Sequence, residues 1–215
     1  MKRTTLVLAG VLLLAAGCAR PAPARNSPQT TPTASSTPEA GPSATSSSAT
    51  GSGAASGPAF TVTYDWNVPS REVRVEHRVD VPPVPELVEV RTGDHPEGGF
   101  ARITFAFRDA FPAYHFQYVR EIVSDGEGAP IALPGNGFLT IVFTPARSNA
   151  SNGGVQRVGY RNLVSYVRAG NYEGYVTYGI GISVAPGSDQ VLPVRVGELT
   201  RPDGSHVVAV DIKNG

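Results

Sequence analysis

The sequence predicts a mostly β domain, a β-sandwich or open barrel with at most one short helix. Three observations lead to this fold class. Apolar and polar residues alternate with a period of two in several short runs, the longest of which covers nine residues from Val176 to Val184. Turn-forming Gly, Pro, Asn and Asp residues separate these runs, for example at 134–137 and 202–204. Only one segment has a helical spacing of its apolar residues. Short alternating strands between such turns are typical of sandwiches and barrels.

The alternating runs place the expected strands along the chain. Ile103, Phe105 and Phe107 share one side of their strand, and prolines at 82, 83 and 85 predict an extended connector before it. The segment 161–169 is the one helix candidate, because Leu163 and Val167 are spaced as on one helix face, but it could equally be a strand. We expect strands at 60–66, 73–79, 86–92, 103–107, 116–122, 138–144, 176–184 and 206–212.

The first 18 residues predict a lipoprotein signal peptide. Lys2 and Arg3 precede an apolar run of about a dozen residues, which would rise only about 18 Å as a helix and is too short to span a membrane. The run ends in small residues at Cys18 and resembles a bacterial lipobox, with Leu14 one place further from the cysteine than the best-fitting position. We therefore expect lipidation of Cys18 by diacylglycerol and acyl chains such as palmitate. An ordinary signal peptide with an incidental cysteine is the alternative.

Cysteine usage supports lipidation and an extracytoplasmic location. Cys18 is the one cysteine in the chain, so an intramolecular disulfide is impossible. A lone thiol in an oxidising compartment is reactive, and acylation would remove that reactivity. Two or three acyl chains would hold the protein at the cell membrane, where one chain alone binds weakly.

The segment 19–58 predicts a disordered stalk. Of its 40 residues, 35 are Ala, Ser, Thr, Pro or Gly, and none is aromatic or an aliphatic larger than Ala. Such a segment has no apolar side chains whose burial could offset the entropy of ordering. We expect a spacer, and its Ser, Thr and Pro content also suits O-glycosylation.

The remaining residues, 59–215, are enough for one domain with a core. We divide them into an N-terminal β extension at 59–86 and a β domain at 87–215. This part carries 14 Arg or Lys (18 less Lys2, Arg3, Arg20 and Arg25) and 17 Asp or Glu (18 less Glu39), a net charge of −3. Nucleic-acid binding is therefore not expected, because it requires a basic surface.

Several motifs in the β domain together resemble a known family. The motifs are Gly93–Pro96, Phe100–Phe107, Tyr114–Val119, Asp125–Gly128, Phe138–Thr144, Asn171–Gly181 and Val207–Ile212. Over 87–213 the chain is similar to the AMIN-like lipoproteins of actinobacteria, relatives of the AMIN domains of cell-wall amidases and secretin pores. The resemblance implies a β-sandwich with an envelope role, often peptidoglycan or partner binding, and it implies no enzyme. One departure is Ala101, where the family usually has an Asp before the Arg.

The sequence predicts no catalytic residues, no metal site and no cofactor. The four histidines are far apart in the chain and lack ligand spacing, and no GxSxG motif or cysteine nucleophile lies in the domain. Two alternatives stay open at this point: a Ser/His/Asp triad assembled in space, and a glycosidase pair of Glu127 and Glu173.

Tyrosines are the strongest candidates for ligand contact. Five of them fall within the nineteen residues 160–178. If Val176 and Tyr178 face the core, Tyr175 lies on the other side of its strand beside Gly179 and Gly181. That arrangement predicts an open aromatic platform for a sugar ring, with a second covered face as the alternative. The predicted ligand-binding residues are Tyr172, Tyr175, Arg161 and Arg168, the arginines as donors to carboxylates of cell-wall peptides.

These observations lead to one leading hypothesis and two others. We expect a membrane-anchored extracytoplasmic lipoprotein that acts as a non-catalytic envelope-binding module for peptidoglycan or wall glycan. An adaptor that binds an envelope protein partner is the alternative, and a hydrolase is a third.

Overall fold

The structure, a computed structural model, describes residues 59–151, 153–187 and 191–215. The predicted signal peptide, Cys18 and the predicted stalk lie outside these described residues. Within the described residues, no helix has the length and apolar character needed to cross a membrane.

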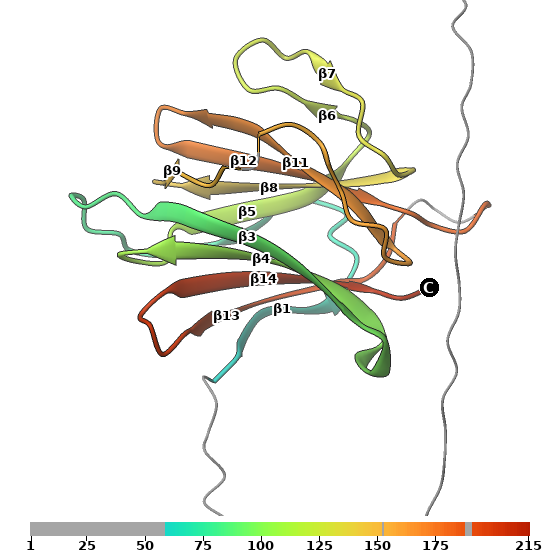
Figure 1. The fold of residues 1–215 in the computed structure, drawn as a ribbon, viewed down its shortest axis with the longest axis horizontal. Coiled ribbons are helices and arrows are strands. Elements are labelled where there is room, and N and C mark those ends of the chain that lie inside the picture. The colour runs from blue at the N-terminus through green and yellow to red at the C-terminus, as the bar shows by residue number, and fades with distance from the viewer. Residues whose placement is uncertain (1–58, 152, 188–190) are drawn as a thin grey trace, which may run out of the picture. The chain divides into compact units, whose positions relative to one another are not determined.

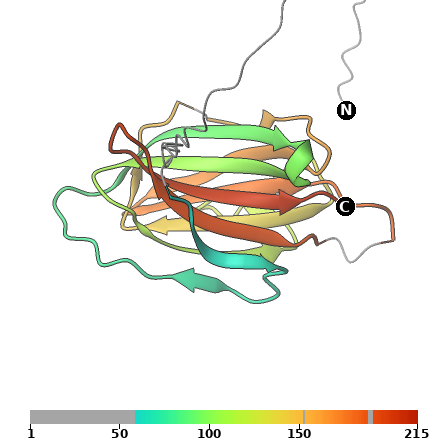
Figure 2. The ribbon, with the colours of Figure 1, turned by 90° about the horizontal axis from the view of Figure 1, so that it is seen from below.

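Two six-stranded sheets stack as the layers of a β-sandwich (Figure 1). We call them sheet A and sheet B; Figure 2 looks onto sheet A. Sheet A consists, in spatial order, of β1 (Thr61–Asn67), β13 (Val194–Thr200), β14 (His206–Lys213), β4 (Phe100–Arg108), β3 (Glu86–His95) and β9 (Arg147–Ser148). Sheet B consists of β10 (Gln156–Arg157), β11 (Leu163–Tyr172), β12 (Tyr175–Ile182), β8 (Gly137–Thr144), β5 (Ala113–Val119) and β2 (Val73–Val75).

A small hairpin of β6 (Ile122–Val123) and β7 (Pro130–Ile131) lies over the outer face of sheet B (Figure 1). In the part of the chain that the structure describes, the one helical element is η1 (Pro96–Gly98), a single 3₁₀ turn between β3 and β4. The predicted mostly β fold is confirmed. The sequence left a β-sandwich and an open barrel as alternatives. The two separate sheets identify the fold as a sandwich.

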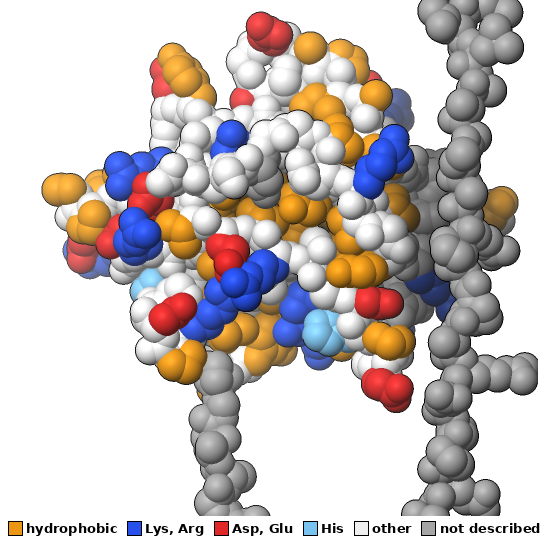
Figure 3. All heavy atoms as spheres, viewed as in Figure 1, with side chains coloured by type: hydrophobic (Ala, Val, Ile, Leu, Met, Phe, Trp, Pro, Cys, Tyr) orange, Lys and Arg blue, Asp and Glu red, His pale blue; other side chains and the backbone are white. Residues whose placement is uncertain are grey.

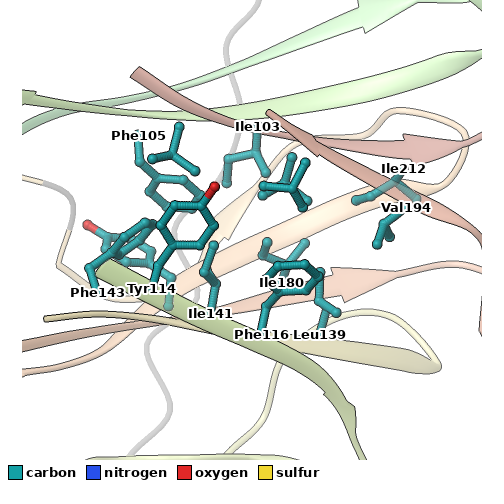
Figure 4. Packing of buried hydrophobic residues seen from close by; sticks show 14 of the residues in the cluster. Ile103, Phe105, Tyr114, Phe116, Leu139, Ile141, Phe143, Ile180, Val194 and Ile212 are labelled. Carbon is teal, nitrogen blue, oxygen red and sulfur yellow. The ribbon is translucent and has the colours of Figure 1, made fainter. Parts of the chain in front are cut away.

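The core lies between the two sheets, and Figure 4 shows side chains from both pointing toward one another. Phe105 of β4 contacts Phe143 and Tyr178 of sheet B, each at 5.0 Å between ring centroids. Burying one such side chain stabilises the fold by about 1.5–3 kcal/mol. The predicted row on β12 and its extension is buried throughout: Val176, Tyr178, Ile180, Ile182 and Val184.

The segment with helical spacing is strand β11. Leu163 belongs to the main core, whereas Val167 and Ala169 belong to a second cluster beneath the β6–β7 hairpin. A register shift between Leu163 and Ser165 accompanies this change of side. Because both faces of β11 are covered, its apolar residues do not alternate cleanly, and the period of the pattern is ambiguous.

The N-terminal extension contributes one edge strand to each sheet. β1 pairs with β13 in sheet A, and β2 pairs with β5 in sheet B. Polar groups tie the extension to the sandwich: Thr63 Oγ1 lies 2.8 Å from the Tyr114 hydroxyl, which donates to Glu198. His77 Nε2 lies 2.8 Å from the same carboxylate.

Charged side chains of both signs are interspersed over the face of the molecule in Figure 3. Ion pairs link charged residues on and next to the strands of sheet A, such as Arg201 with Glu89 at 2.9 Å and Arg108 with Glu86 at 2.7 Å. Among the described residues on this face, no broad area of one sign is visible.

Candidate functional site

The β11–β12 hairpin places two tyrosines side by side at its tip. Its two turn residues, Glu173 and Gly174, have φ angles of 49° and 82°, as in the type I′ turns that favour glycine. Tyr172 and Tyr175 are directly opposite each other across the hairpin, so their side chains share one face. They are 69% and 49% exposed, an unusual exposure for two neighbouring aromatic rings.

A row of side chains crosses the outer face of sheet B next to these tyrosines. Val142 of β8 is the cross-strand partner of both His115 on β5 and Thr177 on β12. Residues paired in this way lie on the same side of a sheet. Tyr175, two residues before Thr177, therefore continues the same surface along β12.

Asp125, in the turn of the β6–β7 hairpin, closes one side of this surface. Its backbone N–H donates to the Ala169 carbonyl at 3.0 Å, and its Oδ2 accepts from the Thr177 hydroxyl at 2.7 Å. A Cβ on Gly170 would overlap the carboxylate of Asp125. The absence of a side chain at Gly170 is what lets this carboxylate approach the sheet.

Together these elements form a pocket of about 390 Å³. It combines two phenol rings, an imidazole, two carboxylates and a hydroxyl around an apolar floor. Pockets with aromatic walls and a few polar groups are typical of small-ligand sites. Its lining residues are His115, Asp125, Gly126, Val142, Tyr172, Glu173, Tyr175 and Thr177.

The His115 imidazole is partly buried in this row. Burial lowers its pKa, and Arg74 adds to this effect. Glu72, whose carboxylate oxygen lies 3.7 Å from His115 Nε2, acts in the opposite direction. The net direction is downward because desolvation of the imidazolium outweighs a long ion pair.

The structure does not bring the two predicted arginines to the tyrosines. Arg168 is the cross-strand partner of Tyr178, so it lies on the core side of sheet B, where Nη1 donates to Ser148 Oγ and the Ala150 carbonyl. Arg161 is exposed before the start of β11, about 35 Å along the strand from Tyr172 at 3.3 Å per residue.

The glycines that were expected to lie open beside Tyr175 are covered. Gly179 is buried, and a Cβ there would lie 2.6 Å from the Ile122 side chain of the hairpin. Thr177 is also buried. The outer face of sheet B is thus exposed at the tyrosines and covered further along β12, because the hairpin needs glycine beneath it.

Sequence analysis did not identify His115, Asp125, Val142 and Thr177 as a group. Thr177 lies on the side of Tyr175 because strand residues alternate with a period of two, and this alternation is the sequence signal that could have found it. The other three come from two strands and a turn. Strand pairing makes His115 and Val142 neighbours of Thr177, and the β6–β7 hairpin brings Asp125 to it.

The two residues of the glycosidase alternative can also be placed. Glu173 lines the pocket, and Glu127 is exposed in the β6–β7 turn. Within residues 59–151, 153–187 and 191–215, no group of three or more His, Cys, Asp or Glu side chains could hold a metal ion.

Comparison with known proteins gives one match. The family model described as AMIN-like domain matches residues 85–214, more than half of the chain. No curated protein and no solved structure matches the chain. The matched region contains every residue that lines the tyrosine pocket and begins after β1 and β2.

Proposed function

The chain belongs to the AMIN-like domain family, and from this membership we propose that it is a membrane-anchored extracytoplasmic lipoprotein that binds wall glycan without catalysis. The family itself indicates an envelope-associated binding module outside the cytoplasm. The lipid anchor, the glycan and the non-catalytic role are the parts that we add.

The observation that supports glycan binding is the exposed pair of tyrosines beside Asp125. A sugar ring has apolar C–H faces that stack on aromatic rings and hydroxyls that donate to carboxylates. Tyr172 and Tyr175 offer the rings, and Asp125 and Glu173 offer acceptors in the same pocket. A volume of about 390 Å³ falls within the range of small-ligand sites.

The charge of the pocket favours a hydroxyl-rich ligand over an anionic one. Two of its lining side chains are carboxylates, and none is an arginine or lysine. Peptide carboxylates are therefore poor ligands for this pocket, and Arg161 and Arg168 are not part of the proposed site. Two of the exposed lining groups are aromatic rings that contribute contact area, which supports recognition over chemistry.

The test is binding of the full chain to purified peptidoglycan. The double variant Tyr172→Ala/Tyr175→Ala should bind at least fivefold more weakly, since aromatic contacts contribute about 0.5–1.5 kcal/mol each. The matched control Tyr172→Phe/Tyr175→Phe keeps both rings and should retain most of the binding. Melting temperatures of all three proteins should agree closely, because both tyrosines are exposed.

Undiminished wall binding by the alanine double variant would contradict the glycan proposal. Absence of wall binding by the unmodified protein, together with co-purification of an envelope protein from detergent-solubilised membranes, would support the adaptor alternative.

The anchor has a separate test. Cys18→Ala should release the protein from the membrane fraction, because an apolar run of about a dozen residues cannot span a bilayer. The released protein should lack the mass of the acyl chains. Unchanged membrane retention of the variant would contradict lipid anchoring at Cys18.

A further inference from the structure

A second cluster of charged and aromatic side chains lies on the opposite side of the sandwich, on the outer face of sheet A. Its centre is Asp211 on β14, whose cross-strand partners are Arg195 on β13 and Arg102 on β4. All three side chains therefore stand in one row on the same face.

Asp211 is completely buried, and both arginines hydrogen-bond to it. Arg102 donates from Nε to Oδ1 at 2.5 Å and from Nη2 to Oδ2 at 2.9 Å. Arg195 donates from Nε and Nη2 to Oδ2 at 3.0 and 2.7 Å. One carboxylate thus orients two guanidinium groups.

Three aromatic rings surround the two guanidinium groups. The Arg102 Cζ lies 4.9 Å from the Phe60 ring centroid and 5.3 Å from that of Phe100. The Arg195 Cζ lies 4.8 Å from the Trp66 ring centroid and 5.3 Å from that of Phe100. Cation–π contacts of this length hold the arginines in place and exclude water from their flat faces.

The cluster carries one positive charge that Asp211 does not compensate. An arginine has five N–H donors, and each of these two uses two of them on Asp211, so three remain on each. The arginine side chains are 22% and 24% exposed, so these donors are accessible from solvent. Lys213, two residues after Asp211 on β14, lies on the same side of the sheet and adds a second cation nearby.

We propose that the Arg102–Asp211–Arg195 cluster is a second binding site, for a singly charged anionic group. The ligand group is a carboxylate or a phosphodiester, which share the oxygen geometry that guanidinium donors recognise. Its charge would match the uncompensated positive charge. The surrounding rings strengthen the attraction because they keep water away from the ion pair.

This site does not depend on the glycan proposal. The two sites lie on opposite faces of the sandwich, and they differ in charge: arginines here, carboxylates in the tyrosine pocket. A single ligand group would not suit both. Loss of binding at one site should leave the other intact.

Trp66 provides a direct readout, because it is the single tryptophan of the chain and contacts Arg195. The full chain is titrated with three probes while Trp66 fluorescence is recorded. The probes are N-acetyl-alanyl-alanine with a free carboxylate, the same dipeptide as its C-terminal amide, and dimethyl phosphate. We expect a saturable change with the free carboxylate or the diester, and none with the amide. The anion that binds with the higher affinity shows whether the ligand group is a carboxylate or a phosphodiester.

The variant Arg102→Gln tests the role of the extra charge. It leaves Asp211 paired with Arg195 and leaves the Arg195–Trp66 contact in place, so the fluorescent reporter is kept. The affinity for the anion should fall about tenfold or more, and Arg102→Lys should restore part of it. The matched control is Arg108→Gln, which removes the same charge from the same face of β4, about 20 Å away.

Three results would overturn the proposal. One is a titration in which neither anion changes the Trp66 signal. Another is an equal response to the dipeptide amide. The third is an Arg108→Gln variant that loses as much affinity as Arg102→Gln, which would show general attraction to a charged surface.

Discussion

The outer faces of the two sheets are covered in different ways. On sheet A, long side chains of the sheet itself and of the N-terminal extension cover the surface, with Asp211 buried under Arg102 and Arg195. On sheet B, a separate hairpin packs an apolar cluster around Ile122 onto the strands. The arginines on sheet A keep donors accessible to solvent, whereas the hairpin covers part of sheet B and leaves a pocket beside its tip.

The two faces also differ in which part of the chain builds them. The tyrosine pocket lies entirely within the region that the AMIN-like model matches, residues 85–214. Two of the three rings around the arginine cluster, Phe60 and Trp66, come from before this region. The pocket therefore belongs to the domain itself, and the arginine cluster is completed by the extension.

Ile180→Asp should have the largest effect, because it places an unpaired charge in the core that both sheets share. We expect a loss of about 4 kcal/mol or more, a large fraction of the roughly 5–15 kcal/mol by which a domain is normally stable. Ile180→Val should cost only about 0.5–1.5 kcal/mol. Chemical denaturation followed by circular dichroism measures both. A cooperative transition at the unmodified midpoint in the aspartate variant would contradict the assignment of this core.

Asp211→Asn should damage sheet A selectively. It leaves two guanidinium groups of like charge without their carboxylate, and their partial exposure moderates the penalty to about 2–3 kcal/mol. Trp66 emission should change, while peptidoglycan binding at the tyrosine pocket should persist at temperatures where the variant is folded. Loss of wall binding by the folded variant would show that the two faces are coupled.

Gly179→Leu should damage sheet B selectively. Its side chain would meet Ile122 beneath the hairpin, and overpacking of this kind costs about 1–3 kcal/mol. We expect a displaced β6–β7 hairpin, a disrupted Asp125–Thr177 contact and weaker glycan binding. Trp66 emission serves as the internal control and should stay unchanged, because Trp66 lies on sheet A. A change as large as the one caused by Asp211→Asn would show that the two faces are not independent.

His115 should give the smallest effect and a pH dependence. Because its pKa in the folded protein is lowered from its ordinary value of about 6.5, the unfolded chain binds the proton more readily. The associated stability is fully present above pH 6.5 and declines as the pH falls through the lowered pKa. His115→Gln should remove this decline. The melting temperatures of the unmodified protein and of the His115→Gln variant at pH 8 and pH 5 measure this decline. The same difference between the two proteins at both pH values would contradict the prediction.

Local patterns predicted most of the long strands but missed β13, and they placed the strand at 116–122 three residues later than β5. The alternation from Val176 to Val184 correctly identified a buried row, and turn residues separated the strands. The prediction for 161–169 stayed ambiguous because a strand covered on both faces has no clean period. The expected openness of Gly179 was wrong because nothing local to β12 indicates that a hairpin from 122–131 covers it.

The sequence by itself determined the fold class, the buried side of β12 and the position of Tyr175 on the other side of that strand, because alternation acts between near neighbours. That Tyr172 lies opposite Tyr175 across a hairpin came from the structure. The sequence also predicted the signal peptide, Cys18 and the stalk, which lie outside the described residues. Only the tertiary structure decided that Asp125 and His115 join the tyrosines, and that Arg168 does not. Only it placed Arg102, Arg195 and Asp211 in one row. These residues meet through strand pairing between segments far apart in the chain, and the register of that pairing is set by the core as a whole.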